Sequence, residues 1–180
     1  MGHSAGAMSA TGFGVIMLTT LCGGASPAHA DAFTPALMAN VQAEGQSQFM
    51  TGVRGSCSAK SHIATGAVGT DITNNQIPFI CDAAVFITFD KQNIHTMITF
   101  AEKATTKGVI AFSGLMDAKT NMLLVQKVYF EPGKPTYVDE GACKLFFSGK
   151  HMTGIYCGGK IDADGQRTVA SIVFDAEPGQ

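Results

Sequence analysis

The chain has 180 residues, of which 12 are basic and 14 are acidic, and its formal net charge is −2. With nearly balanced charge and no block of Lys or Arg, it lacks the surface that nucleic acid or an anionic membrane would attract. Its length suits one domain with a hydrophobic core of its own, so a second domain is not expected.

The N-terminal segment has the pattern of an export signal. An apolar run at 15–21 is followed by the sequence Ala-His-Ala, ending at Ala30, which is the small-x-small pattern that signal peptidase cleaves. We therefore predict a signal peptide at 1–30, cleavage between Ala30 and Asp31, and a single disulfide-bonded β domain at 31–180. No Lys or Arg precedes the apolar run, which leaves the true start of the chain open.

Two features bear on how the chain relates to membranes. Cys22 raises a lipoprotein interpretation, but Leu21 directly before it is larger than a lipid-attachment site accepts. The apolar run is too short to cross a bilayer. The mature protein is therefore expected to be soluble, in the periplasm or secreted.

The first element expected in the mature chain is a short helix. Thr34 can cap its N-terminus, Pro35 suits the first helical position, and Gly45 stops the pattern. Between them, apolar residues recur at helical spacing: Leu37, Met38 and Val41. A helix with one apolar stripe is expected to lie against the sheet or over one end of a barrel.

The remainder of the chain reads as β-strands separated by turns. The expected strands lie at 52–56, 62–68, 79–89, 94–102, 107–115, 121–131, 142–148, 152–161 and 167–174. This spacing, with almost no helix between the strands, indicates an all-β antiparallel meander of about eight strands. Such a meander forms either a small calycin-like barrel or a two-sheet sandwich.

Hairpin registers follow from the turns. A tight turn at 91–92 in the hairpin at 79–102 puts Cys81 on the same face as Val85 and sets Val85 opposite Ile98.

In the last hairpin, a three-residue loop at 149–151 sets Leu145 opposite Ile155. The same register sets Cys143 directly opposite Cys157, so the apolar face and the two thiols align together.

Four cysteines remain after residue 30, and an even number in an exported chain indicates two disulfides. The hairpin register assigns Cys143 to Cys157 and leaves Cys57 with Cys81. The rival interpretation is a Cys₄ zinc site, which would need paired Cys-x-x-Cys sequences that the chain lacks.

Several of these strands are apolar on both faces. The large aromatic residues on the second apolar face are Phe86, Phe112, Phe146 and Tyr156. A barrel with a filled or ligand-holding interior, whose outside meets a helix or another subunit, would bury both faces. We take these four residues as the candidate site for an apolar ligand or a protein partner.

No motif predicts an enzyme. After residue 30 there is no Gly-x-Ser-x-Gly sequence, no glycine-rich phosphate loop leads into a helix, and two disulfides leave no free thiol. The alternative is a hydrolase-type enzyme whose site is assembled only by the fold, with His62, His95 and His151 as titratable candidates. That alternative requires two of these histidines close to a carboxylate in one cleft.

Two patterns resemble parts of metal sites, and neither is complete. The stretch from Asp162 to Gly165 resembles the opening of a calcium loop, but the closing glutamate is missing and a hairpin turn explains it better. His95 and Met97 share one face of a strand and offer soft ligands to Cu(I), yet two ligands do not fill a coordination sphere. No metal and no cofactor are predicted.

Ser148-Gly149 resembles the start of the Ser-Gly-x-x-Tyr loop of periplasmic lysozyme inhibitors, which are also small, exported, disulfide-bonded β-barrels. Met152 stands where the tyrosine would be, so the resemblance implies the architecture and transfers no site. The leading hypothesis is a non-enzymatic exported binding module for an apolar small molecule or a protein partner, with homo-oligomers as an option. A protein of the lysozyme-inhibitor type is the alternative within this architecture.

Overall fold

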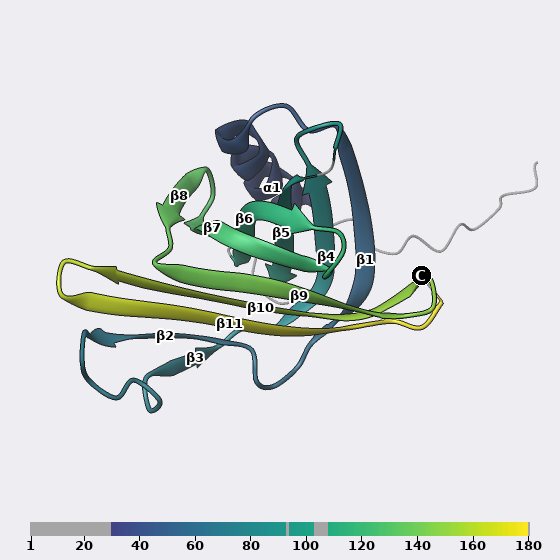
Figure 1. Cartoon of the computed structure of the whole chain (residues 1–180). Coiled ribbons are helices and arrows are strands. Elements are labelled where there is room, and N and C mark those ends of the chain that lie inside the picture. The colour runs from purple at the N-terminus through teal and green to yellow at the C-terminus, as the bar shows by residue number, and fades with distance from the viewer. Residues whose placement is uncertain (1–29, 93, 103–107, 180) are drawn as a thin grey trace, which may run out of the picture.

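The structure is a computed structural model that describes residues 30–92, 94–102 and 108–179. The proposed signal peptide, apart from Ala30, lies outside these residues. One helix and eleven strands are described (Figure 1). Their bounds are α1 Ala30–Glu44, β1 Phe49–Cys57, β2 His62–Ala67, β3 Gln76–Pro78, β4 Cys81–Thr88, β5 His95–Glu102, β6 Val109–Asp117, β7 Met122–Glu131, β8 Lys134–Tyr137, β9 Glu140–Ser148, β10 His151–Ala163 and β11 Gln166–Ala176.

Eight strands close into an antiparallel barrel in the order β1, β4, β5, β6, β7, β9, β10, β11. The seam lies between β1 and β11, where 55–57 pair with 174–176. Strands β2 and β3 extend the sheet from β11 outside the barrel, and β8 pairs with β7. The prediction of an all-β antiparallel fold with one short helix is confirmed, and its form is the barrel.

The barrel interior is packed with side chains. Its buried apolar residues are Val53, Phe79, Cys81, Ala84, Phe86, Ile98, Phe100, Ile110, Phe112, Leu123, Val125, Val128, Cys143, Leu145, Ile155, Cys157, Ile161, Ala170, Ile172 and Phe174. Phe100 lies edge-on to Phe112, with ring centroids 6.2 Å apart, and 5.9 Å from the ring of Phe174. Aromatic side chains from opposite parts of the sheet thus meet at the centre.

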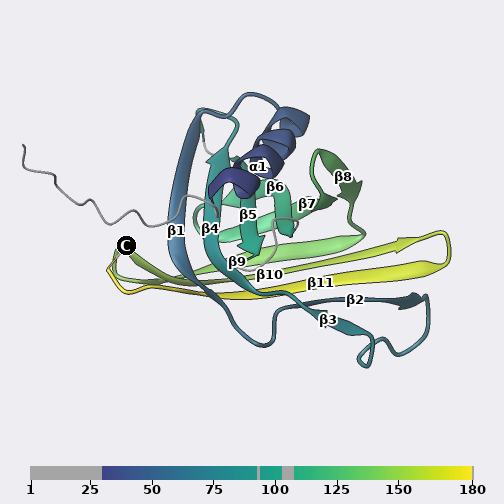
Figure 2. The same cartoon turned by 180° about the vertical axis from the view of Figure 1, so that it is seen from behind.

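Helix α1 covers the outside of the barrel over β4, β5 and β6 (Figure 2). Leu37 and Val41 pack there in a second apolar cluster. The strand residues of that cluster are Val85, Ile87, Met97, Ala111 and Tyr129. This arrangement explains why these strands are apolar on both faces: one face fills the barrel and the other lies under the helix.

The start of the helix differs from the prediction. It begins at Ala30, before the predicted cap Thr34, so Pro35 lies inside it and is not its first residue. Proline has the φ of a helix, but as the sixth residue of α1 it lacks the amide that would donate to the carbonyl of residue 31.

The predicted register of β4 and β5 is wrong by one residue. Val85 pairs with Thr99. The cause is a loop longer than the predicted turn at 91–92, because the Asp90 carboxylate accepts hydrogen bonds from the amides of Ile94 and His95 at 2.8 and 2.6 Å.

A bulge in β4 also overturns the predicted face of its cysteine. The register shifts between Cys81 and Ala83, and Cys81 joins the interior cluster with Phe86. Val85 lies under the helix instead. One extra residue in a strand reverses the faces on either side of it.

The last hairpin has the predicted pairing at its centre and a different turn. Cys143 pairs with Cys157, as predicted. The loop has two residues, Gly149 and Lys150, in place of three, and a bulge next to Met152 takes up the extra residue. The register beyond the bulge is unchanged as a result.

The following turn is a hairpin turn, as predicted for this stretch. Asp164 and Gly165 have φ values of 50° and 74°. Two consecutive positive φ values are typical of a two-residue type I′ turn. Strand β8 was not predicted, because its four residues are all exposed and give no alternating pattern.

Both predicted disulfides are present, Cys57–Cys81 and Cys143–Cys157. The first ties the end of β1 to the start of β4, and the second crosses the β9–β10 hairpin. Two disulfides indicate an oxidising compartment, as found outside the cytosol.

Candidate functional site

The structure does not bring the four predicted ligand-binding residues together. Phe86 and Phe112 are buried in the barrel interior, at 8% and 0% exposure. Phe146 and Tyr156 are 47% and 48% exposed. The predicted site therefore divides into a packed half and a surface half.

The surface half belongs to a larger apolar patch. Leu115 on β6 lies directly opposite Leu124 on β7. Met122, two residues before Leu124 on the same face, pairs with Lys144, which in turn pairs with Tyr156. We call this patch the outer apolar face, made of Leu115, Met122, Leu124, Phe146 and Tyr156, all at least 40% exposed.

Sequence reasoning did not find this face as a unit. The outer apolar face forms only when β7 lies beside β9. Strand β8 lies between them in the sequence but is not one of the barrel strands. The exposed leucines alone gave no signal, since single apolar residues are common on protein surfaces.

A buried polar cluster lies where α1 ends on the barrel wall. The Glu44 side chain is fully buried, and its carboxylate contacts His95 Nε2 at 2.8 Å and Lys127 Nζ at 3.1 Å. It also accepts a short hydrogen bond from the Tyr129 hydroxyl. Ser113 Oγ lies 3.3 Å from the same His95 nitrogen. We call these five residues the polar cluster.

Burial is the largest single influence on Glu44 and by itself would raise its pKa. The hydrogen bonds from Tyr129 and Lys127, together with the positive charges of Lys127 and His95, outweigh it and hold the pKa of Glu44 below its ordinary value. Burial and the bond to Glu44 raise the pKa of Tyr129. Glu44 is thus an ionised acceptor and Tyr129 a protonated donor at neutral pH.

One feature of the sequence could have indicated this cluster. Glu44 follows Leu37 and Val41 at spacings of four and three, so it continues the apolar stripe of the helix. A carboxylate on a buried stripe needs polar partners, and those partners come from two strands, β5 and β7.

The cluster lacks the arrangement of a Ser-His-acid triad. In a triad the acid and the serine bond different nitrogens of the histidine ring. Here Glu44 and Ser113 both contact Nε2 of His95, and Ser113 is buried at 1% exposure. The geometry suits a structural tie between helix and barrel.

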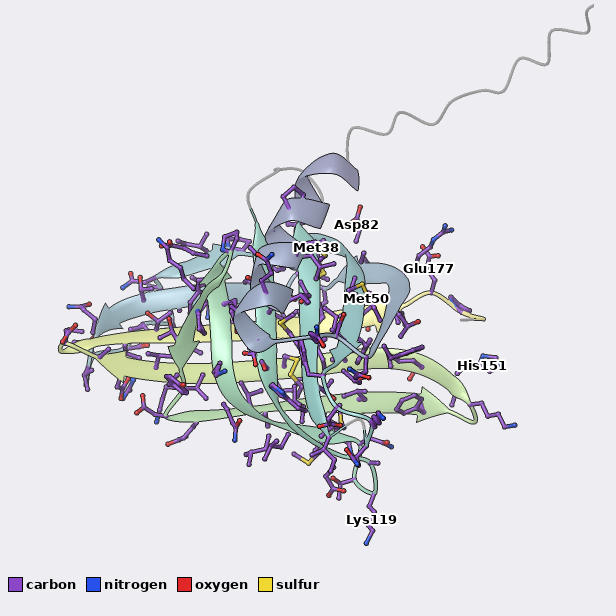
Figure 3. The ribbon with its side chains drawn as sticks, turned by 90° about the horizontal axis from the view of Figure 1, so that it is seen from above. Met38, Met50, Asp82, Lys119, His151 and Glu177 are labelled. Carbon is purple, nitrogen blue, oxygen red and sulfur yellow. A yellow bond between two sulfur atoms is a disulfide. The ribbon has the colours of Figure 1, made fainter. Side chains whose placement is uncertain are left out.

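The other histidines lie elsewhere. His62 Nδ1 lies 2.7 Å from the carbonyl of Lys60, and His151 lies at the tip of the β9–β10 hairpin (Figure 3). The enzyme alternative requires two histidines close to a carboxylate in one cleft; His95 on β5 contacts Glu44, whereas His62 and His151 lie on other strands, β2 and β10.

Candidate metal ligands are equally separate. Met97 shares the outer face of β5 with His95 but is fully buried beneath α1. Asp162 pairs with Arg167, its carboxylate 2.7 Å from the guanidinium. Within the described residues, no three His, Cys, Asp or Glu side chains gather in a way that could hold a metal ion.

The fold and these surfaces define a class: a disulfide-bonded, eight-stranded antiparallel barrel with a helix on its outer wall and an exposed apolar face. Comparison with models of known protein families, with curated proteins and with solved structures finds no match to this chain. In the part of the chain that is described, α1 included, no helix has the length and apolar content of a membrane span.

Proposed function

We propose that this protein is a non-enzymatic, exported binding module that contacts a protein partner through its outer apolar face. The observation that carries the proposal is five large, exposed apolar side chains that share one outer face across β6, β7, β9 and β10, around Lys144. Leu124, at 62% exposure, is the most exposed of them. Contiguous exposed apolar patches on soluble domains usually serve binding.

The composition of the face supports a protein partner. Tyr, Phe and Met are enriched at protein interfaces, and a large aromatic ring contributes much contact area with little loss of conformational entropy. The packed interior, in which Phe112 is fully buried, disfavours a ligand held inside the barrel. Lys144 lies among the apolar side chains and offers one charged contact to the partner.

The non-enzymatic part of the proposal is supported by the polar cluster. Its carboxylate is fully buried and its serine is closed to substrate. Of the three histidines that sequence reasoning offers to an enzyme, His95 is thus used to hold α1 in place.

A photo-reactive amino acid in place of Leu124, in the full-length chain expressed in its producing cells, is expected to form a discrete covalent adduct with the partner. The same label in place of Ile77, which is 65% exposed on β3, is expected to form none. Leu124→Ser and Tyr156→Ser should each weaken binding of the captured partner by about tenfold, as expected for truncated contacts at the centre of an interface.

Other outcomes separate the alternatives. An adduct from a label at Lys150, with none at Leu124, would favour an inhibitor-type contact through the β9–β10 hairpin tip. Saturable binding of the apolar dye ANS that Leu124→Ser leaves unchanged would assign an apolar ligand to another surface. Equal adducts at Leu124 and Ile77 would contradict the proposal.

A further inference from the structure

Strand β1 has a backbone edge that no other described strand covers. Its residues 49–54 pair on one side with β4. On the other side only 55–57 pair with a strand, namely β11. Figures 1 and 2 show the first half of β1 at the margin of the sheet. Within the described part of the chain, the edge of 49–53 is therefore open.

The path of the C-terminal tail explains the opening. Strand β11 ends at Ala176, and the amide of Glu177 donates to the carbonyl of Arg54 at 2.9 Å. Pro178 then supplies no amide, and Gly179, with a φ of 90°, takes the chain out of the strand conformation. The strand that would cover 49–53 stops one residue past Ala176.

The composition of this edge differs from that of the other sheet edges. Strand β3 has three residues and ends in a proline, and β8 has four residues that include Lys134 and Pro135. Short length, lysine and proline are the usual protections against edge-to-edge association. The stretch 45–53 contains no charged residue and no proline.

The side chains at this edge are also apolar and exposed. Phe49 is 59% exposed and Met50 is 42% exposed. Met50 pairs with Ile87, so it lies on the same outer face as α1, whose Met38 is 47% exposed. Figure 3 shows Met38 and Met50 on neighbouring parts of this surface. A long, uncharged, apolar edge of this kind is a site where another strand adds.

We propose that β1 pairs antiparallel with β1 of a second copy of this chain, across a two-fold axis at Thr51. The carbonyl of Arg54 faces away from β4, since it accepts from Glu177. By the alternation of the ladder, the backbone groups of Met50 and Gly52 face the same open edge. A two-fold axis at Thr51 places Met50 opposite Gly52 of the second copy. The outward N–H and C=O groups of these two residues in one copy then pair with those in the other.

The side chains fit the same symmetry. A Cβ built on Gly52 meets no atom within 4 Å, so a Met50 side chain from the second copy has room above it. Phe49 falls opposite Val53. Because 45–53 carries no charge, the axis brings no like charges together, which is the condition that a self-complementary contact must meet. This surface is separate from the outer apolar face, and the inference does not depend on the proposed function.

The test measures the mass of the disulfide-bonded full chain in solution by sedimentation at increasing concentration. We expect a reversible dimer. Met50→Pro removes an outward amide without touching the ladder to β4, and Met50→Lys places like charges near the axis. Each should raise the dissociation constant by about tenfold or more. Ile77→Lys, on the edge strand β3, is the matched control and should leave the mass unchanged.

A cysteine at the axis tests the register independently of stability. Residues directly opposite across an antiparallel pair have Cβ atoms about 5 Å apart, so Thr51→Cys should cross-link two copies on a non-reducing gel. Thr73→Cys, in an exposed loop, should not. A wild-type chain that stays monomeric, or a Thr51→Cys chain that cross-links only to a different protein, would overturn the proposal.

Discussion

Replacing Glu44 with glutamine is expected to lower the free energy of unfolding by about 2 to 3 kcal/mol at neutral pH. Removing one member of a buried ion pair costs about 3 to 5 kcal/mol when the other stays buried. Lys127 and His95 are 22% and 30% exposed, so water recovers part of this loss. The Tyr129 hydroxyl keeps only a neutral acceptor, which is a weaker partner than a carboxylate.

The effect of Glu44→Gln should depend on pH in a defined direction. The pKa of Glu44 in the folded protein lies below its ordinary value of 4.5. Its ionised form therefore stabilises the fold at pH values above 4.5, and this stabilisation is lost as the pH falls through the folded pKa. Urea denaturation of wild type and variant should show a difference in the free energy of unfolding at neutral pH that shrinks below pH 4.5.

Glu131→Gln is the matched control for this experiment. Glu131 forms an ion pair with Lys134, but both side chains are largely exposed, at 66% and 76%. Exposed pairs contribute little to stability because water screens them, so the loss should be small. Equal losses from Glu44→Gln and Glu131→Gln would contradict the structural role assigned to the polar cluster.

Removing the Cys57–Cys81 bridge is expected to destabilise the protein by about 3 kcal/mol, and more than removing Cys143–Cys157. The cysteines of the first bridge are 24 residues apart in sequence, and those of the second are 14 apart. The first bridge therefore removes more conformational entropy from the unfolded chain. The second also crosses the middle of a hairpin that backbone pairing already holds in register.

The measurement compares denaturation midpoints of two double variants, Cys57→Ala with Cys81→Ala, and Cys143→Ala with Cys157→Ala. Replacing both members of a pair avoids a free thiol and disulfide exchange. The slope of the denaturation curve should stay constant if only stability changes. A larger loss from the hairpin pair would show that the β9–β10 ladder depends on its bridge more than the β1–β4 ladder does.

The features that the sequence predicted correctly are local or repeat with a short period. The Cys143–Cys157 pairing follows from one hairpin, in which the two-residue alternation aligns thiols and apolar residues together. The β4–β5 register was not predictable, because it depends on how the Asp90 carboxylate folds the loop. A bulge in β4 is equally invisible in a pattern of apolar residues.

The candidate surfaces required contacts between distant segments. Glu44 meets its partners from β5 and β7 only after α1 has docked. Leu124 and Phe146 share one face only because β9 pairs with the start of β7, while β8 pairs with its end. Aromatic residues could be recognised from the sequence. That Phe112 points into the barrel and Phe146 into solvent depends on how the strands close into the barrel.

The seam between β1 and β11 has a consequence for the order of folding. It joins the first and the last strand of the described chain, so it is the pairing with the largest loop to close. Folding slows as contacts become more distant in sequence, and closure waits for β11 to emerge from synthesis. Until then Phe100 has no contact with Phe174, and the future interior faces water. Chains with exposed apolar surface and unpaired strand edges are prone to aggregation, so late closure of this seam lengthens the time at risk.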